Sequence, residues 1–292
     1  MSVAGAPQFQ ILKPDWFIRQ TNSECGFQIH AMDLLKELGD DFTGVDGIRL
    51  SPARLTTLET LLMQTFSPRV RARPLQRFKS KKNVVFLLRV WPSGRVSSVH
   101  VVAKLFVMDR FDNEFHILRE GHQKGLAVPR VLGAQDGVIL MSFIPGETLV
   151  ERINRTFEPG MIDRLAEWYY KYHMTLGRNK GDPRLRNFII NNGAIFGVDF
   201  EESEPGHWIV DIAGISASLL DTEPVFDVRK RALAWRLLEK YLNLRGASRG
   251  RVIDGRFIET VSSTLKQTAH WRRDDTLLAL AERVAAEGIP VG

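Results

Sequence analysis

The residues of this chain best suited to chemistry lie in one short stretch of its second half. Asp182 follows Gly181, Asn187 comes five positions later, and Asp199 ends an apolar run. Phosphoryl transfer requires a carboxylate that orients the attacking hydroxyl and oxygen ligands that hold a divalent cation on the phosphates. Asp182 would serve the hydroxyl, and Asn187 and Asp199 the metal. Each residue alone could be an ordinary loop residue, but their order and spacing together predict a kinase.

A short β-hairpin is predicted to position these residues. Residues 188–190 and 195–199 are mostly apolar and flank Asn191-Asn192-Gly193, a sequence typical of a type I′ turn. Residues 161–176 repeat apolar side chains at helical spacing. We therefore expect Asp182 in a loop between this helix and the hairpin, with Asp199 at the end of the second strand.

The remaining pattern predicts an α+β fold with a small β-rich lobe and a larger helical lobe. Strands are expected at 75–78, 84–91, 96–107 and 138–143, and helices at 112–124, 225–242, 256–268 and 274–287. We divide the chain into an N-terminal extension (1–74), a nucleotide-binding lobe (75–141) and a helical lobe with the catalytic loop (142–292). Within the extension, Ser51-Pro52 is a good helix start, with serine as the cap, and 67–74 is a basic connector.

Lys104 lies in the apolar run Val101–Leu105, where an unpaired ammonium would be costly to bury. An acidic residue of the following helix is the expected partner. Glu114 is the first choice, and Glu120 stays open because the connection from Lys104 to Glu114 is short. Such a pair would bind the α- and β-phosphates of a nucleotide. Arg184, two residues after Asp182, could reach the transferred phosphate.

The positive charge is concentrated in one segment. The chain carries a net charge of +6, and residues 60–108 contain no acidic side chain. Their basic residues are Arg69, Arg71, Arg73, Arg77, Lys79, Lys81, Lys82, Arg89, Arg95 and Lys104. A polyanion is the natural partner of such a segment, either a nucleic acid or the triphosphate of a nucleotide.

Cys25 is the only cysteine, which excludes an internal disulfide and fits a reducing cytoplasm. No run approaches the roughly 18 apolar residues that a membrane helix needs, so we expect no membrane partner.

Taken together, these motifs resemble the protein-kinase-like superfamily, and most of all its aminoglycoside phosphotransferase and RIO-like branches. The matching stretches are Val101–Lys104 (the third-strand lysine), Asn113–Phe115 (the following helix), Leu140–Gly146 (the hinge between the lobes), Gly181–Asn187 (the catalytic loop), Val198–Phe200 (the metal-binding strand end) and Asp211 (a helical aspartate that steadies the catalytic loop). The resemblance implies ATP and Mg²⁺ as cofactors. It also implies that the hinge backbone, at Ser142 and Ile144, binds adenine.

The chain departs from the superfamily's pattern at three places. The loop 79–83, where glycines often cover the phosphates, contains none, so Ser80 and Lys82 are expected to contact the phosphates instead. Lys180 stands where a histidine is common, and Glu201 where a glycine is common. None of these changes removes a group that the chemistry requires, so we predict an active enzyme.

The acceptor is less constrained than the reaction. The helical lobe, residues 142–292, has no net charge, whereas a lobe that docks RNA should be basic. This favours a small hydroxylated molecule as acceptor, with RNA or a protein as the alternative. A second hypothesis, based on the glycine-free loop and the basic segment, is a non-catalytic nucleotide-binding scaffold or a nucleic-acid-binding module.

Overall fold

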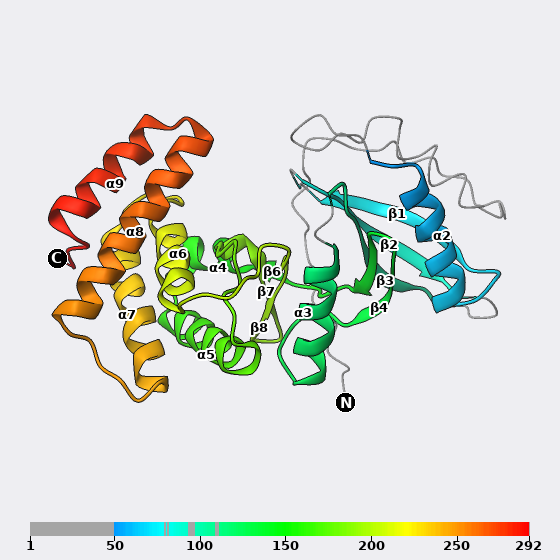
Figure 1. Cartoon of the computed structure of the whole chain (residues 1–292), viewed down its shortest axis with the longest axis horizontal. Helices are drawn as coiled ribbons and strands as arrows, with labels where there is room; N and C mark the ends of the chain where they lie inside the picture. Colours follow the sequence, from blue (N-terminus) through cyan, green and yellow to red (C-terminus); the bar gives the residue numbers. More distant parts are fainter. Residues whose placement is uncertain (1–49, 79, 81, 93–96, 109–110, 292) are drawn as a thin grey trace, which may run out of the picture.

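The computed structural model describes residues 50–291 except 79, 81, 93–96 and 109–110. Within them the chain forms two lobes, a β-rich lobe and a helical lobe, as Figure 1 shows. The β-rich lobe contains a five-stranded antiparallel sheet of order β1-β2-β3-β5-β4. The strands are β1 (Arg71–Phe78), β2 (Val84–Trp91), β3 (Val99–Leu105), β4 (Val131–Gln135) and β5 (Val138–Ser142). The predicted α+β plan is thus the observed one.

The alternation of side chains along the strands separates the two faces of this sheet. In β2, Val84, Phe86, Leu88 and Val90 all point into one apolar core. Ala103 of β3 belongs to the same core, so its neighbour Lys104 points to the opposite face. On that face Lys104 lies across from Ile139 of β5. The pleat therefore directs one lysine of an apolar strand toward the helical lobe.

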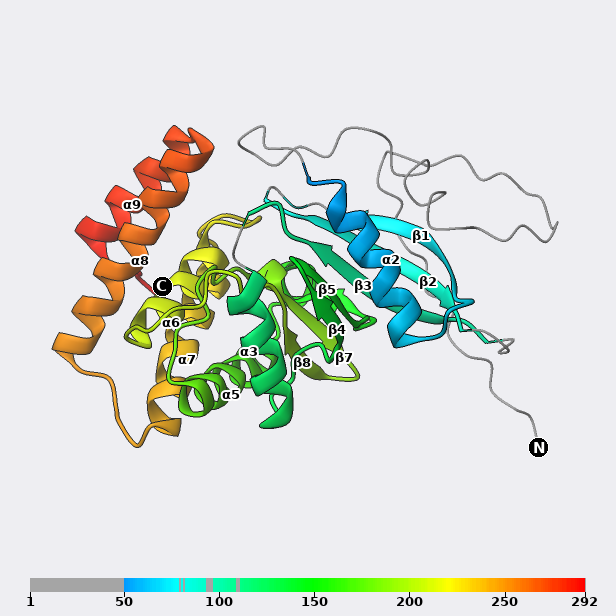
Figure 2. The ribbon, with the colours of Figure 1, turned by 45° about the vertical axis from the view of Figure 1, so that its right-hand side comes forward.

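Helix α2 (Ala53–Thr65) covers the other face of the sheet, as Figure 2 shows. Leu58 and Leu62, which are buried, join the core of the β-rich lobe. Helix α2 is therefore an integral layer of that lobe. Two sequence expectations were wrong here: Ser51 is not the side-chain cap, since Pro52 is the N-cap and no side chain bonds there, and β1 begins at Arg71 instead of residue 75.

Strand β1 was missed in part because it is an edge strand. Its first residues alternate between exposed arginine and buried alanine, and Pro74 lies at a register shift opposite β2. Proline within a sheet is confined to such an edge or to an irregularity, and charged side chains are common there. The expected boundary at residue 74 falls inside this strand. Residues 1–49, which make up most of the expected extension, lie outside the described part of the chain.

The helical lobe is built on a small sheet of β6 (Glu147–Thr148), β7 (Phe188–Asn191) and β8 (Ala194–Gly197), with helices packed on it. Its helices are α4 (Leu149–Thr156), α5 (Pro159–Leu176), α6 (Ile209–Leu220), α7 (Val228–Leu244), α8 (Arg251–Arg272) and α9 (Asp275–Glu287). The predicted hairpin is β7–β8, and Asn192 and Gly193 at its turn both have positive φ, 46° and 78°. A type I′ turn requires this geometry.

The lobes are joined by more than the connecting chain. Helix α3 (Phe111–Gln123) is followed by a loop whose Ala127 carbonyl accepts hydrogen bonds from the Trp168 indole and the Gly197 backbone, each at 3.0 Å. These bonds fix the loop against α5 and β8. One apolar core runs from Phe106 through these contacts into the helical lobe. Among the described helices, none combines the length and apolar character needed to cross a bilayer.

Candidate active site

The loop between α5 and the hairpin has a conformation that depends on glycine. Helix α5 is capped by Gly177, and Asn179 then pairs with Glu204 through backbone bonds of 2.8 and 3.2 Å. Gly181 has a φ of +88°, and a Cβ there would lie 2.2 Å from the carbonyl oxygen of Glu202. Only glycine fits this close approach. The loop is thereby held against the segment that follows β8.

Asp182, which comes next, is held by two neighbours. Its Oδ1 accepts a bond from Arg184 Nε at 2.9 Å, and its Oδ2 accepts one from Asn187 Nδ2 at 3.1 Å. The side chain remains partly exposed. Because the Asn187 amide nitrogen donates to Asp182, the amide oxygen is the atom with which Asn187 could hold a metal. The structure thus brings together Asp182, Arg184 and Asn187.

Asp211, in the first turn of the buried helix α6, supports this loop from beneath. Its Oδ2 accepts a hydrogen bond of 2.5 Å from the Lys180 backbone N–H and lies 2.9 Å from His173 Nε2. The other ring nitrogen of His173 lies 2.8 Å from the Tyr241 hydroxyl. A chain of buried polar groups therefore ties the loop to helices α5, α6 and α7. This contact agrees with the steadying position that the resemblance implied for Asp211.

Lys104 lies at the centre of a cluster of carboxylates. Its Nζ is 2.6 Å from Glu114, 2.8 Å from Asp199 and 3.6 Å from Glu201. Burial alone would lower the pKa of Lys104, but the three carboxylates outweigh it and raise that pKa above its ordinary value. Glu114 is therefore the partner on α3. The fallback residue, Glu120, is exposed and pairs with Lys124 at 2.6 Å.

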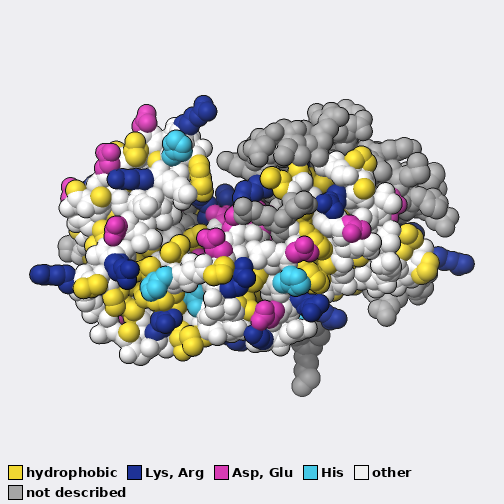
Figure 3. All heavy atoms as spheres, in the orientation of Figure 1, with side chains coloured by type: hydrophobic (Ala, Val, Ile, Leu, Met, Phe, Trp, Pro, Cys, Tyr) yellow, Lys and Arg dark blue, Asp and Glu magenta, His cyan; other side chains and the backbone are white. Residues whose placement is uncertain are grey.

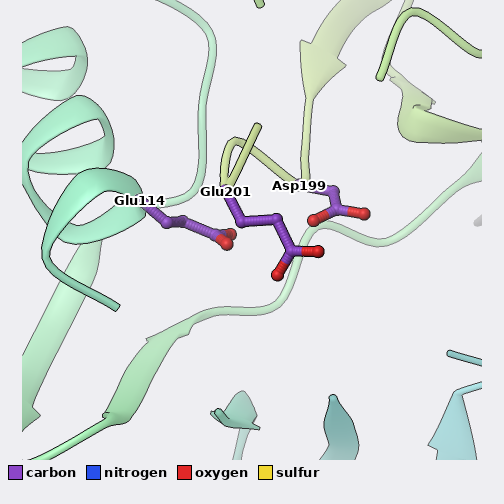
Figure 4. A group of neighbouring side chains, drawn as sticks. All are labelled: Glu114, Asp199 and Glu201. Carbon is purple, nitrogen blue, oxygen red and sulfur yellow. The ribbon is translucent and has the colours of Figure 1, made fainter. Parts of the chain in front are cut away.

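Figure 4 shows the three carboxylates converging, Glu114 from α3 and the other two from the segment that follows β8. Their nearest oxygens lie within 4.8 Å of one another. Burial raises the pKa of Asp199, but Lys104 and Lys180 more than offset this and hold it below its ordinary value. Three carboxyl groups thus face the single ammonium of Lys104. Such an oxygen-rich cluster suits a hard divalent cation.

The two groups of residues are joined through the hairpin. The Val198 N–H donates to the Asn187 carbonyl at 2.9 Å, which places Asn187 and Asp199 at the same end of the paired strands. Asp199 itself lies two residues beyond the end of β8, in the left-handed region with a φ of 63°. The Lys180 ammonium donates a hydrogen bond of 2.8 Å to the backbone carbonyl of Asp199.

The loop 79–83 is linked to the same segment, although residues 79 and 81 lie outside the described part. Lys82 forms an ion pair with Glu202 and lies 3.7 Å from Glu201. The Asn83 amide donates to Glu201 and accepts from the Val107 N–H at 3.3 Å. Ser80, in contrast, bonds the Asn83 N–H within its own loop at 3.2 Å. Lys82 therefore reaches the carboxylates, whereas Ser80 makes a local turn contact.

At the hinge, Ser142 bonds with the backbone of Arg130: the Ser142 N–H donates to the carbonyl, and the hydroxyl accepts from the N–H, each at 2.9 Å. Ser142 and Ile144 line an open cavity of about 370 Å³, together with His122, Gly125, Leu126, Ala127, Val128, Arg130 and Phe196. None of the carboxylates lines this cavity. Side chains alternate between the two faces of the sheet along β5. Met141 therefore lies on the same face as Lys104, and the Ser142 side chain lies on the opposite face.

The structure adds residues that the sequence did not assign to the site. Glu201 and Lys180 were noted only as departures from a pattern, yet both contact its central groups. The spacing Asp199-Phe200-Glu201, two acids two residues apart, is the signal that would have indicated Glu201. Asn113 donates to the carbonyl oxygens of Glu201 and Ser203 at 3.0 and 2.7 Å. No sequence pattern pointed to this contact, which joins α3 to the helical lobe.

Comparison with known proteins gives the fold. No protein-family model and no curated protein matches the sequence. Among solved structures, amicoumacin kinase in complex with AMP-PNP, Ca²⁺ and its ligand matches with a TM-score of 0.57 and 12% identity, covering 82% of this chain and 95% of that one. A choline/ethanolamine kinase family protein from Mesorhizobium loti matches with a TM-score of 0.51 and 16% identity, over 74% and 87% of the two chains.

An ethanolamine kinase from Plasmodium vivax matches with a TM-score of 0.52 and 13% identity, over 88% of this chain and 89% of that one. At such low identity, what the three have in common with this chain is its architecture. The predicted two-lobed architecture is confirmed, and the fold of this chain is the protein-kinase-like fold that its motifs indicated.

Proposed function

We propose that the protein transfers the γ-phosphate of ATP to a hydroxyl group of a small molecule. The observation that carries this proposal is the meeting of Lys104, Glu114, Asp199 and Glu201 at the end of the hairpin that also positions Asp182. Helical packing alone does not require four ionisable side chains in a largely buried cluster. The similar folds of choline, ethanolamine and amicoumacin kinases support the same reaction class.

In this proposal Asp182 orients the acceptor hydroxyl and accepts its proton as the oxygen attacks phosphorus. Arg184, which is bonded to Asp182, would contact the transferred phosphate. Lys104, positioned by Glu114, binds the phosphates, and Lys82 approaches them from the loop 79–83. The hinge backbone binds adenine at Ile144 and at the Ser142 carbonyl, because the Ser142 N–H already donates to Arg130. Ser80 is the weakest member of this set because its hydroxyl already bonds within its loop.

The donor set fits a divalent cation, with Mg²⁺ as the proposed ion. Asp199 and the amide oxygen of Asn187 would hold it, and Glu201 adds a third oxygen ligand beside Asp199. When bound, the ion neutralises charge on the phosphates and aligns them for transfer. A cytoplasmic location, expected from the single cysteine, is part of the same proposal.

A direct transfer assay tests this function. The protein is incubated with γ-labelled ATP, a divalent cation and separate pools of small hydroxylated molecules, RNA and protein, with choline and ethanolamine as defined members of the first pool. We expect label in the small-molecule pool and a loss of about 10²- to 10⁴-fold with Asp182→Asn. Label that persists unchanged in this variant would refute the role of Asp182, and label only in RNA or protein would refute the small acceptor.

A nucleotide-binding scaffold is the second candidate, favoured by the glycine-free loop whose Lys82 is paired with Glu202. It predicts that the protein binds the ATP analogue with metal but transfers no label to any pool. The basic segment could instead bind RNA. The logarithm of the RNA-binding constant would then fall linearly with the logarithm of the salt concentration, with a slope of about 0.7–0.9 for each phosphate contacted.

A further inference from the structure

Lys180 is a buried cation with an unusual set of partners. Its side chain is fully buried, and its ammonium donates to the Asp199 carbonyl at 2.8 Å. The ammonium also lies 5.6 and 5.0 Å from the ring centroids of Phe188 and Phe200. Among the residues that the structure describes, none places a carboxylate oxygen within 4.0 Å of this ammonium. Burying such a group is costly, which makes its hydrogen bond to the Asp199 carbonyl the contact to explain.

The residue that Lys180 contacts has a backbone conformation that needs support. Asp199 lies in the left-handed region, with a φ of 63°, which residues other than glycine adopt only where surrounding contacts hold them. Two lysines hold its two ends. Lys104, from the β-rich lobe, bonds the carboxylate at 2.8 Å, and Lys180, from the helical lobe, bonds the carbonyl.

The contact of Lys180 differs from that of Lys104 in one respect. Lys104 bonds the carboxylate of Asp199, which would face the metal ion and the nucleotide. Once these bind, the carboxylate must divide its contacts between Lys104 and the metal ion. The Lys180 ammonium bonds the backbone of Asp199. Lys180 is itself fixed, because its backbone N–H donates to the carboxylate of the buried Asp211. Its hold on Asp199 therefore does not depend on a ligand.

We propose that Lys180 is a positioning residue that holds Asp199 in the conformation in which its carboxylate binds the divalent cation. This inference rests on the proposed function to the extent that Asp199 is taken as a metal ligand. Residues behind a metal ligand orient it, and their loss commonly lowers metal affinity by about 10- to 100-fold.

Mn²⁺ titration followed by electron paramagnetic resonance, with and without a non-hydrolysable ATP analogue, tests this role without an acceptor. The variant is Lys180→Met, which keeps the length of the side chain but removes the donor. We expect Mn²⁺ to bind at least about tenfold more weakly. The thermal midpoint should equal or exceed that of the wild type, because a buried charge has been replaced by an apolar chain. A residue that only packs would give the reverse pattern, a lower midpoint and unchanged Mn²⁺ binding.

Two controls complete the experiment. Lys230→Met removes another fully buried lysine, one that bonds Thr222 and Glu223, and should leave Mn²⁺ binding unchanged. Asp199→Asn should abolish binding. If Asp199→Asn loses Mn²⁺ while Lys180→Met keeps it, the inference is wrong and the proposed function stands. If the wild type binds no Mn²⁺, both fall. Should Lys180→Met not fold, Lys180→Leu, which also lacks a donor, is measured with the same expectation.

Discussion

At the scale of single residues, the site depends on which of several similar side chains meet. Helix α3 carries two glutamates that the sequence offered as partners of Lys104, with Glu114 as the first choice and Glu120 left open. The fold separates them: Glu114 is buried 2.6 Å from Lys104, whereas Glu120 is on the exposed side beside Lys124. The choice depends on which face of α3 meets β3, and that is decided by packing between elements that are distant in the chain.

These two glutamates provide a matched pair of variants. Glu114→Gln keeps the shape of the side chain but removes the charge that positions Lys104. A charge-assisted contact of this kind contributes about 1.5–3 kcal/mol, so we expect kcat/KM for ATP to fall about 10- to 100-fold. Glu120→Gln should leave kcat/KM unchanged. Equal effects of the two substitutions in a transfer assay would contradict the assignment of Glu114.

At the scale of elements, the sequence predicted the helices and strands whose apolar residues repeat at a regular spacing and whose ends are marked by turn residues. The β7–β8 hairpin was predicted because Asn192-Gly193 marks its turn, and α3 because Gly125 marks its end. Helix α6 was not delimited because all its residues except Val210 are buried, so its sequence has no polar face. Helix α4 was missed although Thr148 and Glu151 form a capping box. The contacts of Glu201 and Lys180 depend on how loops fold, and no local pattern encodes them.

Helix α2 tests the boundary between extension and lobe. Leu58 is 1% exposed within the core that α2 shares with the sheet, whereas Met63 of the same helix is 42% exposed. We expect Leu58→Ala to reduce the free energy of unfolding by about 2–5 kcal/mol, and Met63→Ala to change it by less than about 0.5 kcal/mol. Urea unfolding followed by circular dichroism measures both. A negligible effect of Leu58→Ala would show that α2 is a dispensable appendage.

The first turn of α7 predicts a dependence of stability on pH. Lys230 is fully buried and donates to Thr222 and Glu223, and burial lowers its pKa to about 8. In the unfolded chain it keeps its proton up to its ordinary pKa of 10.5. Between these values the unfolded state binds more protons, so the free energy of unfolding rises with pH, by at most about 1.4 kcal/mol per unit.

Thermal unfolding of the wild type and of Lys230→Met, measured from pH 7 to 10.5, isolates this residue. Relative to the variant, we expect the wild type to gain stability above pH 8. Parallel curves for the two proteins across this range would mean that Lys230 is not perturbed in the folded state.

At the scale of the whole molecule, the charge of the two lobes is complementary where they meet. The acid-free segment 60–108 contributes Lys82 and Lys104, and the helical lobe contributes Asp199, Glu201 and Glu202. Figure 3 shows acidic and basic side chains together in the notch between the lobes. Part of the positive charge that suggested a polyanion is thus already matched within the protein. Two other basic residues of the segment, Arg73 and Arg89, lie over the Trp91 ring, with their guanidinium carbons 5.8 and 6.0 Å from the ring centroid.

The ion pair between Lys82 and Glu202 is expected to affect the rate at which a nucleotide binds. It links the loop 79–83 to the segment after β8, beside the proposed phosphate site, so we expect it to open before a nucleotide binds there. We expect the observed association rate of a fluorescent ATP analogue, followed by stopped flow, to level off at high nucleotide concentration. Glu202→Gln should raise this plateau several-fold, whereas Glu204→Gln, whose side chain is exposed, should not. A rate that rises linearly without limit would mean that opening is never the slow step; otherwise the lobes themselves set the pace of binding.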